Sequence, residues 1–367
     1  MARRANAATV DKLQVSAYTV PTDSPESDGT LAWDSTTMVL VEVEGGGASG
    51  LGYTYGDVSV AKMIESKFAN LVEGMDAMKP PAAWAAMQQT IRNAGRPGVG
   101  SMAISAVDIA LWDLKARILD VPLADLFPRF HDAVPIYGSG GFTSYSMEQL
   151  QEQLGGWVEE GTPRVKMKVG RHPDQDEHRL QVARDAIGED TELLVDANGA
   201  YTRKQALYWA ERFAEFGVTW LEEPVTSEDL EGLRLIRDRG PAGLSIAAGE
   251  YSWNLFYSNG LLEAGAVDVL QADVTRCSGI TDLLRVDALC KARSIPFSGH
   301  CAPQVHAHVG CAMETLLHLE YFHDHARLEG MLFDGVLRPE NGHLRPDPEK
   351  PGLGIELKRS EAEQYAA

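Results

Sequence analysis

Seven residues whose side chains could do acid, base or metal chemistry recur through the second half of the chain. Successive members lie 20 to 28 residues apart, and each ends or closely follows a short apolar run. That interval is about one strand-plus-helix unit, so a closed parallel barrel would bring all seven to one rim, facing one another. The seven residues are Lys168, Asp196, Glu222, Glu250, Asp273, His300 and Glu320.

Three of the seven are carboxylates from consecutive runs, Asp196, Glu222 and Glu250. Hard oxygen ligands suit a magnesium ion that keeps positions open for substrate and water. Three bare carboxylates would also repel one another strongly, which favours a bound cation. The alternative is that each acid caps the helix after its strand. For three acids in register that alternative requires several coincidences, so the pattern predicts a Mg²⁺ site.

Lys166 and Lys168 flank Met167, and because side chains alternate along a strand their ammonium groups lie on the same side. Their mutual repulsion, and any bound cation nearby, is expected to lower the pKa of at least one of them. A partly neutral Lys168 could then act as a general base near neutral pH. A lysine pair on an exposed edge strand is the alternative for this motif taken alone.

His300 ends one apolar run, and Asp273 ends the run before it. The carboxylate can orient the imidazole and raise its basicity, which predicts a second acid-base group. A metal-dependent hydrolase would instead need a histidine pair near the first barrel strand, where the sequence has none. Other histidines, on expected helical or loop positions, are interpreted as structural groups: His306, His308, His318, His323 and His325.

The elements that must position these residues form a repeating pattern from residue 134 onward. Short apolar runs alternate with amphipathic helical stretches such as 176–187 and 203–216. This alternation indicates a parallel sheet covered on both faces, and eight such units are what a closed βα barrel needs. An open doubly wound sheet is the alternative, but no Gly-x-Gly-x-x-Gly turn supports dinucleotide binding. The eight runs are 134–137, 165–169, 193–195, 218–221, 244–247, 267–270, 295–297 and 316–319.

The first third of the chain indicates a separate α+β segment. Strands are expected at 12–18 and 37–44, where Val39, Val41 and Val43 alternate with other residues. Residues 101–119 carry apolar side chains at helical spacing and predict a buried helix between two units. A domain boundary near Asp132 is therefore expected.

Composition excludes several functional classes. With 33 basic and 53 acidic residues the formal charge is -20, and no basic stripe suggests a nucleic-acid partner. No run approaches 18 uninterrupted apolar residues, and no apolar stretch follows Arg3 and Arg4, so neither a membrane partner nor a signal peptide is predicted. The four cysteines have no Cys-x-x-Cys spacing, which favours reduced thiols in a cytoplasmic protein.

Taken in order, five short motifs resemble the signatures of the mandelate racemase subgroup of the enolase superfamily, also called the mandelate racemase/muconate lactonizing enzyme family. The likeness runs over most of the chain. It implies an α/β fold, a modified TIM barrel of the (β/α)7β type with an α+β capping domain. The cap would be residues 1–132, completed by about 335–367, and the catalytic barrel 133–334. The motifs are Val165-Lys166-Met167-Lys168-Val169, Asp196-Ala197-Asn198, Trp220-Leu221-Glu222-Glu223-Pro224, Gly249-Glu250 and Ser298-Gly299-His300.

The resemblance also implies roles for the site residues. The three carboxylates would hold Mg²⁺, while Lys168 and the histidine dyad would stand on opposite faces of a small carboxylate substrate. Glu320 would contact the substrate carboxylate, Lys166 would lie near metal and substrate oxygens, and Asn198 would border the site. Arg276 stands where several relatives carry lysine or a small residue, and is either a substrate contact or a surface charge. A homo-oligomer is implied as well.

The expected reaction is Mg²⁺-dependent removal of the proton next to a carboxylate, through an enediolate. Two opposed bases allow either a dehydratase or a racemase or epimerase of a 2-hydroxy acid, and the catalytic residues alone do not choose. The expected lids, residues 21–30 and the 52–57 turn, are polar, which suits the many hydroxyls of a sugar acid. Tyr53 and Trp33 are candidate substrate-binding residues. Dehydration of a sugar acid to a 2-keto-3-deoxy acid is the favoured prediction, and a non-catalytic sugar-acid-binding homologue is a further alternative.

Overall fold

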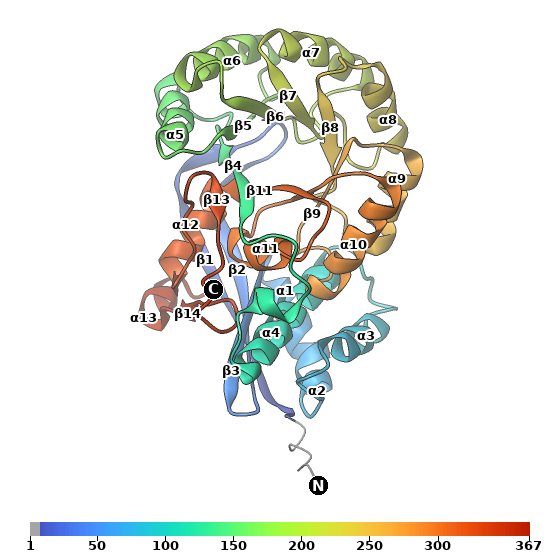
Figure 1. Cartoon of the computed structure of the whole chain (residues 1–367), viewed down its shortest axis with the longest axis vertical. Helices are drawn as coiled ribbons and strands as arrows, with labels where there is room; N and C mark the ends of the chain where they lie inside the picture. Colours follow the sequence, from blue (N-terminus) through green and yellow to red (C-terminus); the bar gives the residue numbers. More distant parts are fainter. Residues whose placement is uncertain (1–7) are drawn as a thin grey trace.

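The computed structural model describes residues 8–367, so Arg3 and Arg4 lie outside the described residues (Figure 1). A parallel barrel and an antiparallel sheet with its own helices make up the molecule. None of the helices in residues 8–367 is long and apolar enough to cross a bilayer.

The barrel has eight parallel strands in the order β4 to β11, and pairing of β11 with β4 closes it. Each of the eight apolar runs singled out in the sequence overlaps one of these strands, which confirms the predicted barrel, although the runs 267–270 and 295–297 begin two residues before β9 and β10. The closure excludes the open doubly wound sheet. The strands are β4 (Val134–Gly140), β5 (Arg164–Lys168), β6 (Glu192–Asp196), β7 (Val218–Glu222), β8 (Ser245–Ala248), β9 (Val269–Ala272), β10 (Phe297–Gly299) and β11 (Leu316–Phe322).

A helix follows each of the first seven barrel strands, which gives the (β/α)7β order. Local sequence fixes several starts: Ser146 and Thr202 each form a reciprocal capping box with a glutamine three residues later. The apolar faces of these helices pack on the outside of the barrel in one continuous core. The helices are α5 (Met147–Glu159), α6 (Pro173–Ile187), α7 (Arg203–Glu215), α8 (Leu230–Arg239), α9 (Leu255–Ala264), α10 (Ile280–Arg293) and α11 (Pro303–Gly310).

The antiparallel sheet consists of β1 (Val10–Ser27), β2 (Ala32–Gly45) and β3 (Ala48–Tyr55), with helix α4 (Val99–Leu119) packed on β3. Close approach of sheet and helix requires glycine, because a Cβ on Gly52 would lie 2.3 Å from the backbone of Ala106 and Ala110. The remaining helices of this unit are α1 (Ser59–Met63), the π-helix η1 (Ile64–Phe68), α2 (Ala69–Val72), α3 (Pro80–Thr90) and the 3₁₀ helix η2 (Leu123–Leu126).

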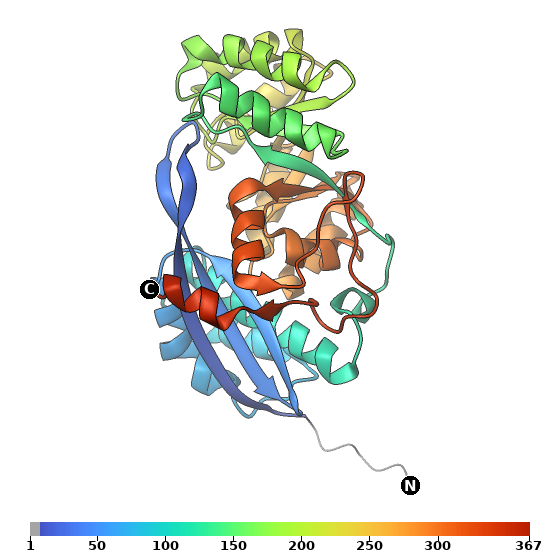
Figure 2. The ribbon, with the colours of Figure 1, turned by 90° about the vertical axis from the view of Figure 1, so that its left-hand side faces the viewer.

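Strands β1 and β2 form a long hairpin that rises from the cap along one side of the barrel (Figure 2). The segment 21–30, expected as a loop-like lid, is therefore strand as far as Ser27, with only residues 28–31 as the tip. The 52–57 segment, expected as a turn, is buried strand β3 as far as Tyr55, and only Gly56 and the exposed Asp57 follow it. Backbone pairing between valine-rich and threonine-rich stretches continues beyond the predicted strand ends, which explains both differences.

The last part of the chain returns to the cap. Tyr18 on β1 bridges to Ala366, and the C-terminal helix lies beside the antiparallel sheet in Figure 2. Residues 343–344, however, pair with β4 of the barrel, and the division of the chain at residues 132 and 335 stays a prediction. The elements are α12 (His323–Leu332), β12 (Phe333–Asp334), β13 (His343–Leu344), β14 (Glu356–Leu357), α13 (Arg359–Ala362) and the 3₁₀ helix η3 (Glu363–Tyr365).

Candidate active site

Side-chain alternation places the site directly above the barrel's apolar interior. Leu194 and Trp220 face inward with Ala247 and Val269 as one buried cluster. Two residues further along the same strands, and thus on the same face, come Asp196 and Glu222. Polar groups thus replace apolar ones at the C-terminal rim, where active sites of such barrels form. All seven residues of the sequence-derived set lie at this rim and are at least 95% buried: Lys168, Asp196, Glu222, Glu250, Asp273, His300 and Glu320.

Asp196, Glu222 and Glu250 each offer an oxygen, and these atoms lie within 4.8 Å of one another. Burial and the charge of Asp196 raise the pKa of Glu222 to about 7. Its Oε1 atom is buried and accepts no hydrogen bond from any residue in 8–367. An orphaned carboxylate oxygen in a three-carboxylate cluster is the environment expected of a site for a hard divalent cation. The residues present fit a metal ion.

The backbone conformation before Glu250 sets the direction of the third carboxylate. Gly249, which precedes Glu250, has a φ of 140°, and a Cβ there would lie 1.9 Å from the carbonyl oxygen of Gln271. Asn198 and Glu223 adopt left-handed φ values of 45° and 38° at the same rim. Strained conformations of this kind persist only where surrounding structure enforces them, and they cluster at functional sites.

Lys166 and Lys168 both point into the barrel rather than lying on an exposed edge strand, so that alternative is wrong. Lys166 Nζ contacts Glu222 at 2.7 Å and Glu320 at 2.8 Å, and Lys168 Nζ contacts Asp196 at 2.5 Å. Burial opposes the charged form of both lysines, yet the carboxylates outweigh it and raise both pKa values above the ordinary range. The expected lowering by mutual repulsion is therefore wrong for these side chains, because the attraction of the neighbouring carboxylates outweighs the repulsion between the two ammonium groups.

His300 Nδ1 lies 2.9 Å from Asp273 Oδ2. Burial acts against the charged form of both residues. The neighbouring His300 nevertheless holds the pKa of Asp273 below its usual value, and nearby carboxylates hold the pKa of His300 above its usual value. The other ring nitrogen, Nε2, lies 3.6 Å from Glu250 and 3.5 Å from Glu320. The predicted pairing of imidazole and carboxylate is thus present in the structure.

Glu320 links the two sides of the rim. Its Oε1 accepts a hydrogen bond from Ser139 Oγ at 2.6 Å and contacts Lys166, while Oε2 accepts one from the backbone N–H of Cys301 at 3.2 Å. Despite burial, the charges of Lys166 and His300 hold the pKa of Glu320 well below its ordinary value. Glu320 is therefore a carboxylate in the folded protein.

A cavity of about 360 Å³ lies over the rim and is lined by both the barrel and the long hairpin. Trp33, Asn198 and Arg276, which the sequence put forward as substrate-binding residues, all line it. Arg276 is no surface charge, because it is largely buried against Glu250 at 3.2 Å and Asp273 at 3.5 Å. Hydroxyl groups on the hairpin side come from Ser35, Thr36 and Thr37.

Tyr53 does not line this cavity, and the expectation that it binds substrate needs correction. It is fully buried, and its hydroxyl donates to Glu329 Oε1 at 2.5 Å. Tyr53 and Tyr55 lie two residues apart on β3 and therefore on the same face, and the hydroxyls of both point to Glu329. Tyr55, at the end of the strand, also lines the cavity, whereas Tyr53 is fully buried in the core.

Glu329 supplies a pH prediction. Burial raises its pKa to about 8 from the usual 4.5, so between these values the folded protein keeps a proton that the unfolded chain has released. The free energy of unfolding should then fall by about 1.4 kcal/mol per pH unit as pH rises through this window. In Glu329→Gln, urea unfolding followed from pH 5 to 8 should lack that component. Glu231→Gln, exposed on α8, should keep the wild-type slope, and equal slopes in all three proteins would contradict the assignment.

Four of the five histidines interpreted as structural groups lie on helices, as predicted: His306 and His308 on α11, and His323 and His325 on α12. His318 differs, because it is buried on barrel strand β11 rather than in a helix or loop. His325 lines the cavity and stacks on Tyr55 with ring centroids 3.4 Å apart. Burial lowers the pKa of His325 to about 3, so it is a neutral ring in the cavity wall.

Sequence reasoning missed two buried residues of the rim. Glu223 packs against the three-carboxylate cluster, where burial and Glu250 raise its pKa well above the ordinary value. Cys301 lines the cavity beside His300. Both directly follow a residue that the sequence did single out, but strand alternation would have turned each away from the site. Left-handed backbone at Glu223 and Cys301 breaks that alternation.

Comparison with known proteins agrees with this architecture. Residues 14–127 match the N-terminal domain of the mandelate racemase/muconate lactonizing enzyme family, and residues 149–362 match the enolase C-terminal domain-like family. A mandelate racemase/muconate lactonizing enzyme-like protein from Rubrobacter xylanophilus is 70% identical and superimposes with a TM-score of 0.96, covering 98% of this chain and all of that chain.

Two relatives carry named activities. The 3,6-anhydro-alpha-L-galactonate cycloisomerase of Streptomyces coelicolor is 31% identical over 95% of this chain and 97% of its own length. The L-talarate/galactarate dehydratase of Salmonella typhimurium is 27% identical over 95% of this chain and 89% of its own length. A mutant L-talarate/galactarate dehydratase, solved with Mg and L-glucarate, superimposes with a TM-score of 0.91 at 26% identity, covering 100% of this chain and 95% of that chain. The chain belongs to the mandelate racemase/muconate lactonizing enzyme family, in the mandelate racemase subgroup of the enolase superfamily.

Proposed function

We propose that this protein dehydrates a sugar acid to a 2-keto-3-deoxy acid. The observation that carries the proposal is that Lys168 and His300 line one cavity from strands on different sides of the barrel rim, β5 and β10, with the three carboxylates between them in strand order. Two proton-transfer groups on different sides of a bound molecule can remove a proton from one carbon and assist departure of a hydroxyl from the next.

Asp196, Glu222 and Glu250 are the proposed ligands of Mg²⁺. The ion would supply Lewis-acid stabilisation of the negative charge that grows on the substrate carboxylate as its neighbouring proton leaves. Lys166, held by Glu222 and Glu320, would add a fixed positive charge at the same oxygens. This local field explains how a chain of formal charge -20 would attract an anion.

In this proposal, His300 and Lys168 are the two groups that transfer protons. His300, oriented by Asp273 and with its pKa raised, is suited to deliver a proton to a departing hydroxyl from Nε2. Lys168 Nζ would exchange protons with the substrate from its own side. Which of the two takes the proton next to the carboxylate depends on the configuration of that carbon, so the pair serves opposite stereoisomers in opposite roles.

The hairpin side of the cavity supports a sugar acid over an aryl or alkyl acid. Ser35, Thr36 and Thr37 line the cavity there; the hydroxyls of Ser35 and Thr36 donate to Asp34 and Asp324, and that of Thr37 pairs with Thr19, so they would serve a substrate mainly as acceptors. A polyhydroxylated substrate buried without partners would be strongly disfavoured. The dehydratase relative, and the sugar acid in the related structure, favour the same class.

A screen of sugar acids tests the proposal. Incubation with Mg²⁺ should yield, for one or a few of them, a keto acid that semicarbazide detects, with the product lighter than the substrate by one water. A keto product of unchanged mass would point to a cycloisomerase, as the Streptomyces relative is named. Inversion at the carbon next to the carboxylate without any keto acid would overturn dehydration in favour of a racemase or epimerase.

Magnesium binding gives a prediction that does not depend on turnover. Titration calorimetry of the metal-free protein should show one Mg²⁺ site per chain, and Asp196→Asn or Glu250→Gln should weaken it at least about tenfold, because each removes a charged oxygen ligand. Asp238→Asn, exposed on α8, is the matched control and should bind as wild type. Unchanged affinity in both site variants would refute the assignment of these carboxylates.

A further inference from the structure

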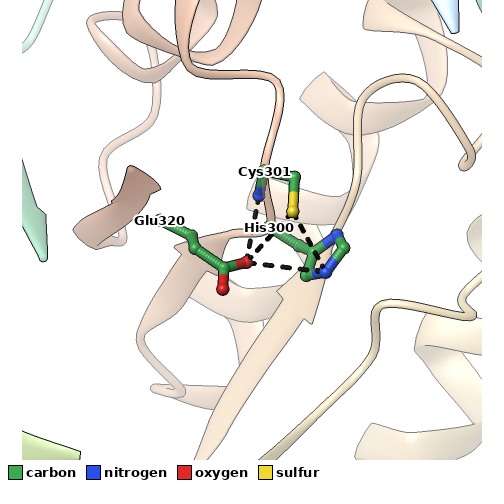
Figure 3. A group of neighbouring side chains, drawn as sticks. All are labelled: His300, Cys301 and Glu320. Carbon is green, nitrogen blue, oxygen red and sulfur yellow. Dashed lines mark hydrogen bonds and ion pairs between the residues drawn. The ribbon is translucent and has the colours of Figure 1, made fainter. Parts of the chain in front are cut away.

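His300, Cys301 and Glu320 converge on one point of the cavity wall (Figure 3). The Cys301 Sγ atom lies 3.4 Å from His300 Nε2 and 3.3 Å from Glu320 Oε2, and those two atoms lie 3.5 Å apart. All three side chains are buried, but each lines the cavity, so a small ion can reach them. A sulfur, a nitrogen and an oxygen thus form a nearly equilateral triangle.

The size of this triangle matches three corners of a tetrahedral zinc site. With Zn–S of about 2.3 Å and Zn–N and Zn–O of about 2.0–2.1 Å, tetrahedral angles separate the ligand atoms by about 3.3–3.6 Å. The measured separations of 3.4 Å for S–N, 3.3 Å for S–O and 3.5 Å for N–O differ from the tetrahedral values of the same atom pairs by about 0.1–0.3 Å. An ion could therefore bind after side-chain shifts of a few tenths of an ångström, leaving its fourth position toward the cavity.

The surroundings hold each ligand in place. His300 Nδ1 is paired with Asp273, so Nε2 is the ring nitrogen that faces the triangle and that can bind a metal once it has released its proton, the usual arrangement behind a metal-binding histidine. The second oxygen of Glu320 is fixed by Ser139 and Lys166. Cys301 is fixed through its backbone, which is left-handed at φ 53° and donates its N–H to Glu320.

We propose that His300, Cys301 and Glu320 form a second metal site, selective for borderline or soft divalent cations such as zinc and cadmium. It differs from the three-carboxylate site by its sulfur ligand, which magnesium does not favour. Binding displaces the thiol proton of Cys301 and the proton on His300 Nε2 to solvent, and leaves a thiolate and a neutral imidazole on the metal. Occupation also takes His300 Nε2, so a bound cation blocks proton transfer at this residue. The metal site itself stands apart from the proposed function, and only the inhibition rests on it.

Cadmium tests the site without any need for activity. In protein saturated with magnesium, one equivalent of Cd²⁺ should produce the ultraviolet charge-transfer band of a cadmium–thiolate bond. Cys301→Ser should lose this band, since a neutral hydroxyl replaces the thiolate. The variant keeps the hydrogen bond from the backbone N–H of residue 301 to Glu320. Cys311 is buried at the C-terminal end of α11, where its thiol donates to the carbonyl oxygen of Ala307, and Cys311→Ser should keep the band. A missing band in wild type, or an unchanged band in Cys301→Ser, would overturn the site.

Zinc tests the inhibition. At saturating Mg²⁺ and with an identified substrate, Zn²⁺ should inhibit the wild type, and the activity of Cys301→Ser should need at least about a hundredfold more zinc for the same loss. Inhibition that is equal in the two proteins and relieved by additional Mg²⁺ would assign zinc to the three carboxylates and overturn the inhibitory role. Should no substrate be found, the proposed function fails while the cadmium result still decides the site.

Discussion

Replacing Lys168 by alanine, or His300 by asparagine, is expected to lower turnover by about a hundred- to ten-thousand-fold, because assistance by a positioned acid or base contributes that much and both proton transfers are obligatory. Substrate binding should survive, since Arg276 lines the cavity and Lys166 is held beneath it among the carboxylates, and both keep their positive charge. Turnover by the keto-acid assay and binding by calorimetry give the two quantities separately. Lys204→Ala and His343→Asn, both exposed, are matched controls that should behave as wild type.

Hydrogen exchange separates the two roles. In deuterated solvent, the variant that retains the base should still exchange the hydrogen next to the substrate carboxylate although no keto acid forms. The variant that loses the base should not. The residue missing from the exchange-competent variant is then the acid for that stereoisomer. Full activity in both variants would contradict the site as proposed.

Lys166→Met is expected to destabilise the metal-free protein by about 3–5 kcal/mol, the usual cost of leaving buried charges without their partner. Lys166 is fully buried and contacts carboxylates of three strands, at 2.7 Å for Glu222, 2.8 Å for Glu320 and 3.8 Å for Asp196. The free energy of unfolding from urea titration measures the loss. Added Mg²⁺ should recover part of it, because a cation among the same carboxylates reduces their repulsion.

An exposed ion pair provides the control for Lys166. Lys62 lies 2.8 Å from Glu65 on the surface of the cap, and Lys62→Met should leave stability unchanged within error, since exposed pairs contribute little. A destabilisation of Lys166→Met as small as that of Lys62→Met would mean that the buried carboxylates take up protons instead of repelling one another. A shift of Glu222 toward its protonated form, visible in the pH dependence of unfolding, would then be expected.

The parallel barrel could be predicted from the sequence because the features that specify it lie in short, continuous stretches of the chain. Each strand is a short continuous apolar run, and the residue that matters chemically ends or closely follows that run, as Asp196 and Glu222 do. Parallel connections then place all strand ends at one rim without further information. For the same reason the approach of Asp273 to His300 followed from their order along the chain.

Features that depend on contacts between distant segments could not be predicted. Which way Tyr53 points depends on how its antiparallel sheet packs on α12, nearly 280 residues further along. The pKa of Lys168 depends on a carboxylate from another strand, Asp196 on β6, whose attraction outweighs the repulsion from Lys166. Cys301 reaches the cavity only because the backbone turns left-handed after β10, and no pattern of residue types encodes that turn.

The long hairpin has a consequence for how such a protein can diverge. The cavity wall contributed by residues 28–37 belongs to a structural unit separate from the barrel that carries every acid, base and metal-ligand candidate. Mutations in this short stretch can reshape the substrate's surroundings while the reactive groups keep their positions. Exchange of that stretch for its counterpart in a relative with another sugar acid is therefore an economical route for protein engineering, with library diversity confined to a handful of codons.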